Sequence, residues 1–215
     1  MIVRKYGLIF RRLQHSDIEI IRKMRNSDDI RRRMHAQQHI TAEQQERWFR
    51  DNNTINNYFF VICAAEKPVG LVQAKNVNYQ ARTGEGGIYI WDSNARSSGI
   101  GAKASLCLLD IAFMMIGLKT ITAKVRTDNP IAQRHNLSFG YCFSEEGSSE
   151  FMTLSRESFF SRAPKLRKLC SRGNDLRPTS IDDMDFPESS ILLELYAGLP
   201  DDIRSIFSEK IKGLN

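Results

Sequence analysis

The sequence has few of the residues on which several common protein classes depend. Its four cysteines, Cys63, Cys107, Cys142 and Cys170, lie far apart and form no C-x-x-C pair, and no histidine cluster at metal-ligand spacing accompanies them. Neither a disulfide scaffold nor a zinc or other metal site is therefore expected. Three of the four, at positions 63, 107 and 142, have apolar neighbours, where a thiol packs as a small hydrophobic group. A catalytic cysteine is not expected either.

Long apolar segments are also missing. The longest apolar run, residues 111–117, is far shorter than the roughly 20 residues needed to span a bilayer. Residues 1–12 carry basic side chains around a brief apolar patch, without the apolar core or the small-residue cleavage site of a signal peptide. We therefore expect no transmembrane helix and no membrane partner, and we predict a cytoplasmic protein.

The composition that is present is that of a globular protein. Hydrophobic residues make up 41% of the 215 residues, too many for wholesale disorder. The formal net charge of +6 favours an anionic partner. Nucleic acid, a phosphorylated small molecule and a polyanionic cofactor all satisfy this charge, so the choice among them depends on motifs.

Hydrophobic patterning predicts a mixed order of strands and helices. Two capping boxes, at Ser16 and Thr41, indicate the starts of two helices. The clearest helical periodicity begins at Ile100, and a short helix is expected from Pro130 to a stop at Gly140. The expected strands cover residues 7–13, 58–64, 69–77, 82–91, 119–126, 141–143 and 151–154, of which the last closes the sheet.

The character of the sequence changes after about residue 160. A basic stretch over residues 162–172 and an acidic stretch over 182–188 predict a linker. A final helix follows Pro200, with one apolar face made of Ile203, Ile206, Phe207, Ile211 and Leu214. Such a face needs cover, either by homodimerisation or by packing back onto the chain. The predicted organisation is one domain over residues 1–160 and a basic linker with a helical C-terminal extension over 161–215.

Residues 88–101 carry the most informative pattern, a strand that runs into a glycine-containing loop and then a long helix. This junction directs several free backbone N–H groups to one place at the positive end of a helix dipole, which favours a phosphate or pyrophosphate. Neither the Walker pattern nor the dinucleotide fingerprint G-x-G-x-x-G is present. The pattern is Arg96-x-x-Gly99-x-Gly101.

This loop resembles the [Q/R]-x-x-G-x-[G/A] cofactor loop of the GNAT superfamily of acyl-CoA-dependent N-acetyltransferases. A second landmark of that superfamily, an asparagine followed by alanine, glycine and an aromatic residue at fixed distances, is met by Asn129, Ala132, Gly140 and Tyr141. The resemblance covers about residues 7–155. It implies an α+β fold, in which a mixed, mostly antiparallel central sheet is flanked by helices.

The resemblance also implies acetyl-CoA as the acyl donor. Backbone amides of the loop would hold the CoA pyrophosphate, and the Arg96 side chain would add charge at the loop entrance. The pantetheine arm would lie along Ile90 and Trp91, where a backbone N–H polarises the thioester carbonyl. Asn129 would anchor the cofactor, cap the next helix, or do both. The predicted cofactor-binding residues are Ile90, Trp91, Arg96, Ser97, Ser98, Gly99, Ile100, Gly101, Ala102 and Asn129.

The implied reaction is direct attack of an amine on the thioester, which requires a base and an acid. Glu85 is the candidate base, although a solvated carboxylate at the start of a strand is an equal alternative. The position where the family often has an acidic tyrosine is Asn136, whose amide cannot donate a proton as an acid. His135, Tyr141, Tyr89 and water are the other candidates for that role.

The N-terminal part resembles a particular branch of the superfamily. The Arg25-Asn26 pair, the His39-Ile40-Thr41 segment and Trp48 are similar to the pattern in acetyltransferases of nucleotide-linked amino sugars, such as those of the pseudaminic acid pathway. They are more loosely similar to the ribosomal-protein N-terminal acetyltransferases. The resemblance implies a small-molecule amine acceptor, most simply a nucleotide sugar, with Arg25, Asn26 and Trp48 as substrate-binding residues.

Basic and aromatic residues around this pattern suit such an acceptor. Residues 31–33, all arginine, offer bidentate contacts to a diphosphate, and Trp48 or Tyr79 could stack on a base. The alternative is a solvated basic face with Trp48 in the core. Two other functions stay open, a protein N-terminal or lysine acetyltransferase and a non-catalytic acyl-CoA-binding module, whereas nucleic acid is not an expected partner.

Overall fold

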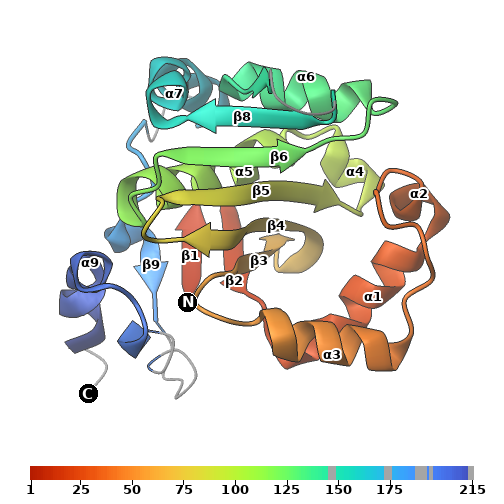
Figure 1. Cartoon of the computed structure of the whole chain (residues 1–215), viewed down its shortest axis with the longest axis horizontal. Helices are drawn as coiled ribbons and strands as arrows, with labels where there is room; N and C mark the ends of the chain where they lie inside the picture. The colour runs from red at the N-terminus through yellow and green to blue at the C-terminus, as the bar shows by residue number, and fades with distance from the viewer. Residues whose placement is uncertain (145–148, 172–175, 187–192, 194–195, 213–215) are drawn as a thin grey trace.

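The strands of the chain form one sheet, in the order β7-β8-β6-β5-β4-β3-β2-β1-β9 (Figure 1). The structure is a computed structural model that describes residues 1–144, 149–171, 176–186, 193 and 196–212, and side chains as far as residue 208. Only β5 and β6 pair in parallel among the described strands. The bounds are β1 Ile2–Lys5, β2 Leu8–Arg12, β3 Tyr58–Ala64, β4 Lys67–Asn78, β5 Thr83–Ile90, β6 Thr120–Lys124, β7 Cys142–Phe143, β8 Phe151–Ser155 and β9 Met184–Asp185.

Helices cover both faces of this sheet. The strand alternation separates two apolar clusters, because successive side chains point to opposite faces. The smaller cluster lies under the N-terminal helices and includes Ile21, Phe59 and Leu71, and the larger one lies under α5 and α7. The helices are α1 Ile18–Asn26, α2 Asp28–Arg31, α3 Ala42–Asn52, α4 Ser93–Arg96, α5 Ile100–Asp110, α6 Pro130–Phe139, α7 Arg156–Cys170 and α9 Asp201–Lys212, and a π-helical turn over Ile111–Met115 follows α5.

The N-terminal region differs from the prediction in two respects. The chain begins with a hairpin, β1–β2, so residues 7–13 supply only its second strand. The predicted capping box at Ser16 is wrong, because Gln14 and Asp17 form the box two residues earlier, where Asp17 also binds Arg11. The box at Thr41 is confirmed: its hydroxyl accepts from the Gln44 N–H, and the Gln44 side chain accepts from the Thr41 N–H.

The region after residue 155 also differs. The linker predicted over 162–172 is wrong for its described part, because residues 156–170 form one helix, α7, whose Arg167 is buried. The strand at 151–155 does not close the sheet either. Strand β7 lies outside it, and at the opposite edge β9 pairs with β1, so the acidic stretch contributes a strand instead of a linker.

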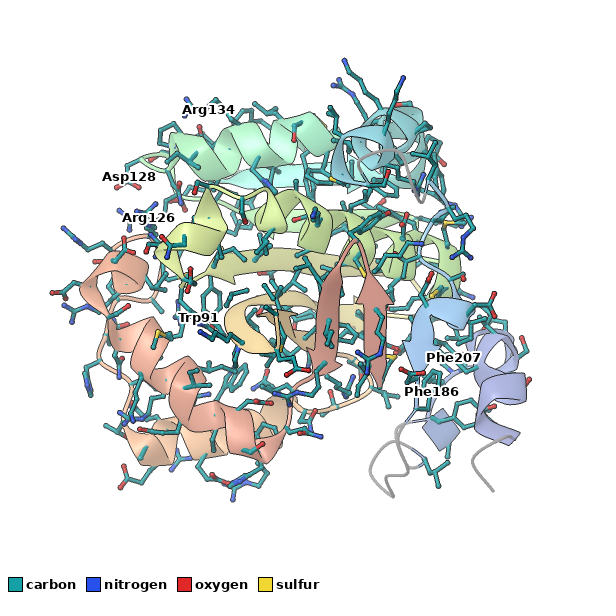
Figure 2. The ribbon with its side chains drawn as sticks, turned by 180° about the vertical axis from the view of Figure 1, so that it is seen from behind. Trp91, Arg126, Asp128, Arg134, Phe186 and Phe207 are labelled. Carbon is teal, nitrogen blue, oxygen red and sulfur yellow. The ribbon has the colours of Figure 1, made fainter. Side chains whose placement is uncertain are left out.

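The apolar face of α9 packs back onto the chain, which is one of the two predicted outcomes. Ile203 and Phe207 are buried, and the Phe207 ring meets that of Phe186 edge to face at 6.0 Å (Figure 2). Ile206 remains 39% exposed. The side chain of Ile211 and the whole of Leu214 lie outside the described residues. Homodimerisation through this face therefore has less apolar surface available than the sequence suggests.

The sequence predicts neither a membrane-spanning helix nor a metal site, and the described residues can be searched for both. No described helix is long and apolar enough to cross a membrane. Within the described residues, no group of three or more histidine, cysteine or acidic side chains could hold a metal ion. The cysteines are free thiols, but Cys142 was wrongly expected in the core: it lies exposed on the edge strand β7, while the other three are buried.

A buried ion pair ties α7 and the C-terminal region to α5. Asp110, the last residue of α5, is fully buried; Arg167 donates to one of its carboxylate oxygens and the Thr179 N–H donates to the other at 2.8 Å. Burial raises the pKa of Asp110, and the hydrogen bond from Thr179 and the charge of Arg167 oppose that rise. The pair holds three segments together at the end of the helix that follows the glycine loop.

Removing one partner of this pair leaves a buried charge without compensation. We expect Arg167→Met to lower the free energy of unfolding by about 3–5 kcal/mol at neutral pH, measured by urea denaturation. Asp110 will then protonate more readily, and a raised folded-state pKa costs stability as pH rises above the unfolded value. The loss should therefore be smaller at about pH 5 than at about pH 8.

Arg4→Met provides the control for this prediction, because the Arg4–Asp185 pair is exposed, at 57% and 61%. Its loss should cost less than about 1 kcal/mol at either pH. An Arg167→Met protein as stable as the control would contradict a structural role for the buried pair.

Candidate functional site

An open wedge between β5 and β6 is the central feature of the site. The parallel pairing of these strands covers only Thr83–Glu85 and ends at the Glu85↔Thr122 position, whereas β5 continues to Ile90. The Trp91 N–H donates to the Val69 carbonyl at 3.0 Å, and the register with β4 is unbroken from there to Glu85. Because N–H groups alternate in an antiparallel ladder, those of Ile88 and Ile90 point away from β4, toward the wedge.

The wedge leads to the N-terminus of α5. Gly99 is the N-cap of α5, with φ at +80° and no side-chain hydrogen bond at the cap. The N–H groups of Ile100, Gly101 and Ala102 occupy the first three helical positions, which have no acceptor within the helix. Free amides at a helix N-terminus favour an anion, which is the kind of ligand that the sequence predicts for this loop.

The two loop glycines leave room for a ligand. A Cβ added at Gly99 would meet nothing within 4 Å, and one at Gly101 would meet only Cε1 of His135, at 4.0 Å. The positive φ of Gly99 also requires glycine, because L side chains are strained there. The residues present therefore fit a bulky phosphate-bearing group such as the pyrophosphate of CoA.

The Arg96 guanidinium is occupied by protein partners, whereas the sequence prediction has its side chain adding charge at the loop entrance. Its Nε donates to the Ile90 carbonyl at 2.8 Å and its Nη2 to the Trp91 carbonyl at 3.1 Å. The same guanidinium forms an ion pair with Asp29 on α2, and this pairing lowers the pKa of Asp29. Arg96 thus fixes the end of β5 and connects the loop to the N-terminal helices.

The other loop side chains fold back onto α4. Ser97 Oγ donates to the Asn94 carbonyl at 3.2 Å, and Ser98 Oγ to the Ala95 carbonyl at 2.8 Å. Ile100 is buried in the larger apolar cluster. Only backbone groups of these residues remain for a ligand, as the prediction of an amide cradle requires.

The second landmark positions α6 on the other side of the wedge. Asn129 caps α6 by accepting from the Ala132 N–H at 3.2 Å. The Asn136 amide contacts Sδ of Met152 at 3.7 Å. His135 turns toward α5, where its Nε2 lies 2.8 Å from Ser105 Oγ, and burial lowers its pKa. None of these three side chains presents an acidic proton to the wedge at neutral pH.

The Tyr141 side chain reaches the narrow end of the wedge, next to the last β5–β6 pair Glu85↔Thr122. It lies on the face of β5 opposite to Glu85. A Cβ added at Gly86 would lie 3.1 Å from the Tyr141 hydroxyl and 3.1 Å from Cγ2 of Ile121. The ring is buried, and burial raises the pKa of its hydroxyl. The sequence motif identifies Tyr141 as an aromatic landmark. It does not predict that the hydroxyl of this residue lies over β5.

Glu85 lies on the opposite face of β5 from the Tyr141 hydroxyl. It pairs with Lys75 directly across the β4–β5 ladder at 2.8 Å and accepts from Asn76 Nδ2 at 3.3 Å. Its side chain is about a third exposed, at 31%. The unbroken register puts it on the same face as Tyr89 and Trp91, beneath α1. The carboxylate is accessible, as a base must be, but it is also ion-paired.

Arg25 places a positive charge on this face of β5, at Tyr89. Its guanidinium lies over the Tyr89 ring, 5.9 Å from the centroid, and Trp91 lies beside Tyr89 with 5.9 Å between the ring centroids. Arg25 forms no ion pair with any described residue. A half-buried guanidinium that is stacked but not neutralised attracts an anionic ligand.

Other residues predicted to bind the acceptor have structural contacts. Asn26 donates to the Ile40 carbonyl and accepts from the Ile40 N–H, each at 2.9 Å, so its amide holds the loop before α3. Trp48 packs edge to face on Phe59 at 5.0 Å, which is the alternative role in the core. Tyr79 is half-buried, and its hydroxyl lies 2.8 Å from that of Tyr58, so it has a structural contact as well.

The basic run after α1 is largely paired with its own acidic neighbours. Arg31 binds Asp28 at 2.6 Å, Arg33 binds Asp29 at 3.0 Å, and Arg32 Nε donates to the Asp28 carbonyl at 3.0 Å. These pairs are solvated, so a stronger anion could still compete for them.

A second basic group borders the site at the start of α6. Figure 2 shows Arg126, Asp128 and Arg134 on one edge of the molecule, near the α4 end of the wedge. Arg126 makes two hydrogen bonds to Asp128, at 2.8 and 2.6 Å, whereas Arg134 has no partner among the described residues. Sequence reasoning missed Arg134 and Asp29, because no motif marks a surface arginine or a partner far away in the chain.

The comparisons with known proteins agree with this geometry. The family described as acetyltransferase (GNAT) domain matches residues 7–141. Among solved structures, a spermidine N-acetyltransferase from Vibrio cholerae, in complex with CoA and spermine, is 20% identical, with a TM-score of 0.63 over 72% of this chain and 98% of that one. A chimera of the Vibrio cholerae enzyme and hSSAT is 21% identical, with a TM-score of 0.62 over 73% and 99%. No curated protein sequence matches the chain.

The glycine cradle makes a specific prediction about binding. We expect Gly99→Ala to weaken the binding of CoA about tenfold, because strain of about 1–2 kcal/mol at the positive φ shifts the amides that follow. Isothermal calorimetry measures the loss.

Gly7→Ala is the matched control, since Gly7 has φ at +73°, an equally open Cβ position and a place in the β1–β2 turn away from the wedge. It should lower stability to a similar degree and leave CoA binding intact. Equal loss of CoA binding in both variants would show that general destabilisation, not the cradle, is responsible.

Proposed function

Because the chain belongs to the GNAT acetyltransferase family, we propose that it transfers an acetyl group from acetyl-CoA to a primary amine that carries an anionic group, and specifically to a nucleotide-linked amino sugar. The chain is an acyl-CoA-dependent N-acyltransferase with acetyl-CoA as the donor. The choice of acceptor rests on the contacts of Arg25, Glu85 and Tyr89.

In this proposal each side of the wedge has a separate task. The amides of Ile100, Gly101 and Ala102 bind the pyrophosphate, and Asn129 orders the start of α6 beside it. The N–H groups of Ile88 and Ile90 bind the pantetheine arm and polarise the thioester carbonyl as negative charge develops on its oxygen. Glu85 accepts, directly or through water, the proton that the attacking amine loses.

The single observation that carries the acceptor proposal is the position of Arg25. Glu85 and Tyr89 lie on one face of β5, four residues apart, which corresponds to about 13 Å along a strand. An amine near Glu85 and an anion at Arg25 must therefore be separated by a spacer of about that length. A hexose with an attached diphosphate has this extent and this charge.

A polyamine fits this face less well. The similar Vibrio cholerae enzyme is named for spermidine, and its structure contains spermine. Both polyamines carry several positive charges. Such a chain along β5 would bring an ammonium group to the Arg25 guanidinium, whose charge no described carboxylate neutralises. Like charges in a partly desolvated site repel, so the face selects against a polycation.

The test is a comparison of acceptors and of two variants of α1. We expect thiol release from acetyl-CoA with a UDP-linked amino sugar and little with spermidine. Arg25→Met should lower kcat/KM for the sugar nucleotide about 10- to 100-fold, the effect of losing a charge-assisted hydrogen bond of about 1.5–3 kcal/mol.

Lys23→Met removes the same charge from the same helix, at an exposed position that pairs with Glu19, and should leave kcat/KM nearly unchanged. Preference for spermidine, or equal effects of the two variants, would overturn the anionic-acceptor proposal.

A further inference from the structure

The reaction needs a proton donor, and the position where one is expected holds Asn136. We infer that Tyr141 supplies the proton to the departing CoA thiolate, an inference that rests on the acetyl transfer described above. The Tyr141 hydroxyl lies beside β5 and carries a proton, and the other side chains that could donate a proton have different contacts.

The chain brings the Tyr141 hydroxyl to the narrow end of the wedge. Gly140 ends α6 with φ at +99°, a conformation that reverses the direction of the chain, and the Tyr141 N–H donates to the Asn136 carbonyl at 3.2 Å. The side chain then extends to Gly86, the first residue of β5 beyond the last β5–β6 pair. The hydroxyl therefore lies where the strands separate.

Gly86 is a requirement of this arrangement. A Cβ at this position would contact the Tyr141 hydroxyl at 3.1 Å and Cγ2 of Ile121 at 3.1 Å, both closer than most real Cβ contacts. Glycine keeps this space open, so the hydroxyl can approach the backbone of β5 and any group bound along it.

The Tyr141 hydroxyl is protonated and available. The residue is only 8% exposed, and burial raises the pKa of the hydroxyl, so that it keeps its proton at neutral pH. No described residue accepts or donates a hydrogen bond to it. A hydroxyl without a protein partner gains one when a bound thioester places its sulfur nearby.

The other candidate side chains are excluded by their contacts. The Asn136 amide has no acidic proton and points to Met152. His135 is neutral because burial lowers its pKa, and it lies against Ser105. The Tyr89 side chain lies on the opposite face of β5, beneath Arg25.

The amine nitrogen forms a bond to the thioester carbonyl carbon, the C–S bond breaks, and the sulfur leaves with the bonding electron pair. Tyr141 Oη gives its proton to that sulfur and so forms the thiol. The proton lost by the amine passes to Glu85 or water, and water then returns a proton to the tyrosinate.

The test compares Tyr141→Phe with Tyr6→Phe. The Tyr6 hydroxyl is also buried, but it lies in the β1–β2 turn beside Arg167. Tyr141→Phe should lower kcat at least tenfold, with the Kd of acetyl-CoA by calorimetry and the Tm unchanged. Tyr6→Phe should leave kcat and the Kd of acetyl-CoA unchanged, and only its Tm should respond to the lost hydroxyl beside Arg167.

The acceptors are a UDP-linked amino sugar and, in parallel, hydroxylamine, a small nucleophile that needs no acceptor site. If only hydroxylamine reacts with the wild type, the acceptor proposal fails while the role of Tyr141 is still tested. Acetyl-seleno-CoA adds a second readout, because a selenolate leaves without protonation: the defect of Tyr141→Phe should largely disappear with it. Unchanged kcat in Tyr141→Phe, or an equal defect with both donors, would overturn the inference.

Discussion

The unequal lengths of the β5–β4 and β5–β6 pairings are the constraint on which the site depends. Beyond Glu85, β5 keeps its pairing with β4 and loses its pairing with β6, so the N–H groups of Ile88 and Ile90 have no strand to bond. Unpaired backbone groups inside a fold are costly unless a partner reaches them. The N–H groups at the wedge remain unpaired in the chain alone. An extended thioester-bearing arm is the kind of ligand that can accept hydrogen bonds from them, as an added strand would.

Each neighbouring element then has a defined part in the site. The π-helical turn and the Asp110–Arg167 pair hold the far end of α5, which leaves its N-terminus directed at the open end of the wedge. Arg96 binds the carbonyls at the end of β5 and also reaches Asp29, so the loop before α5 and the N-terminal helices share one connection.

Much of this was predictable, because local patterns specify it. The strand–loop–helix junction, the glycines at 99 and 101 and the Asn129 cap are local features, and they are present where the sequence placed them. The failures concern contacts between distant residues. Arg96 was expected to face a phosphate, but a carboxylate 67 positions away in the chain binds it. Basic residues 162–170 were assigned to a linker, because their charge hid the apolar positions Phe159, Ala163 and Cys170 that make α7 a packed helix.

Amide hydrogen exchange, followed by NMR with and without CoA, tests the wedge most directly. Strand β5 contains its own control, because the Tyr89 N–H faces β4 and those of Ile88 and Ile90 face the wedge. The account predicts that CoA slows exchange at Ile88 and Ile90 and at the first amides of α5, and leaves Tyr89 unchanged. CoA binding without added protection at Ile88 and Ile90 would contradict the claim that the unpaired edge of β5 holds the donor.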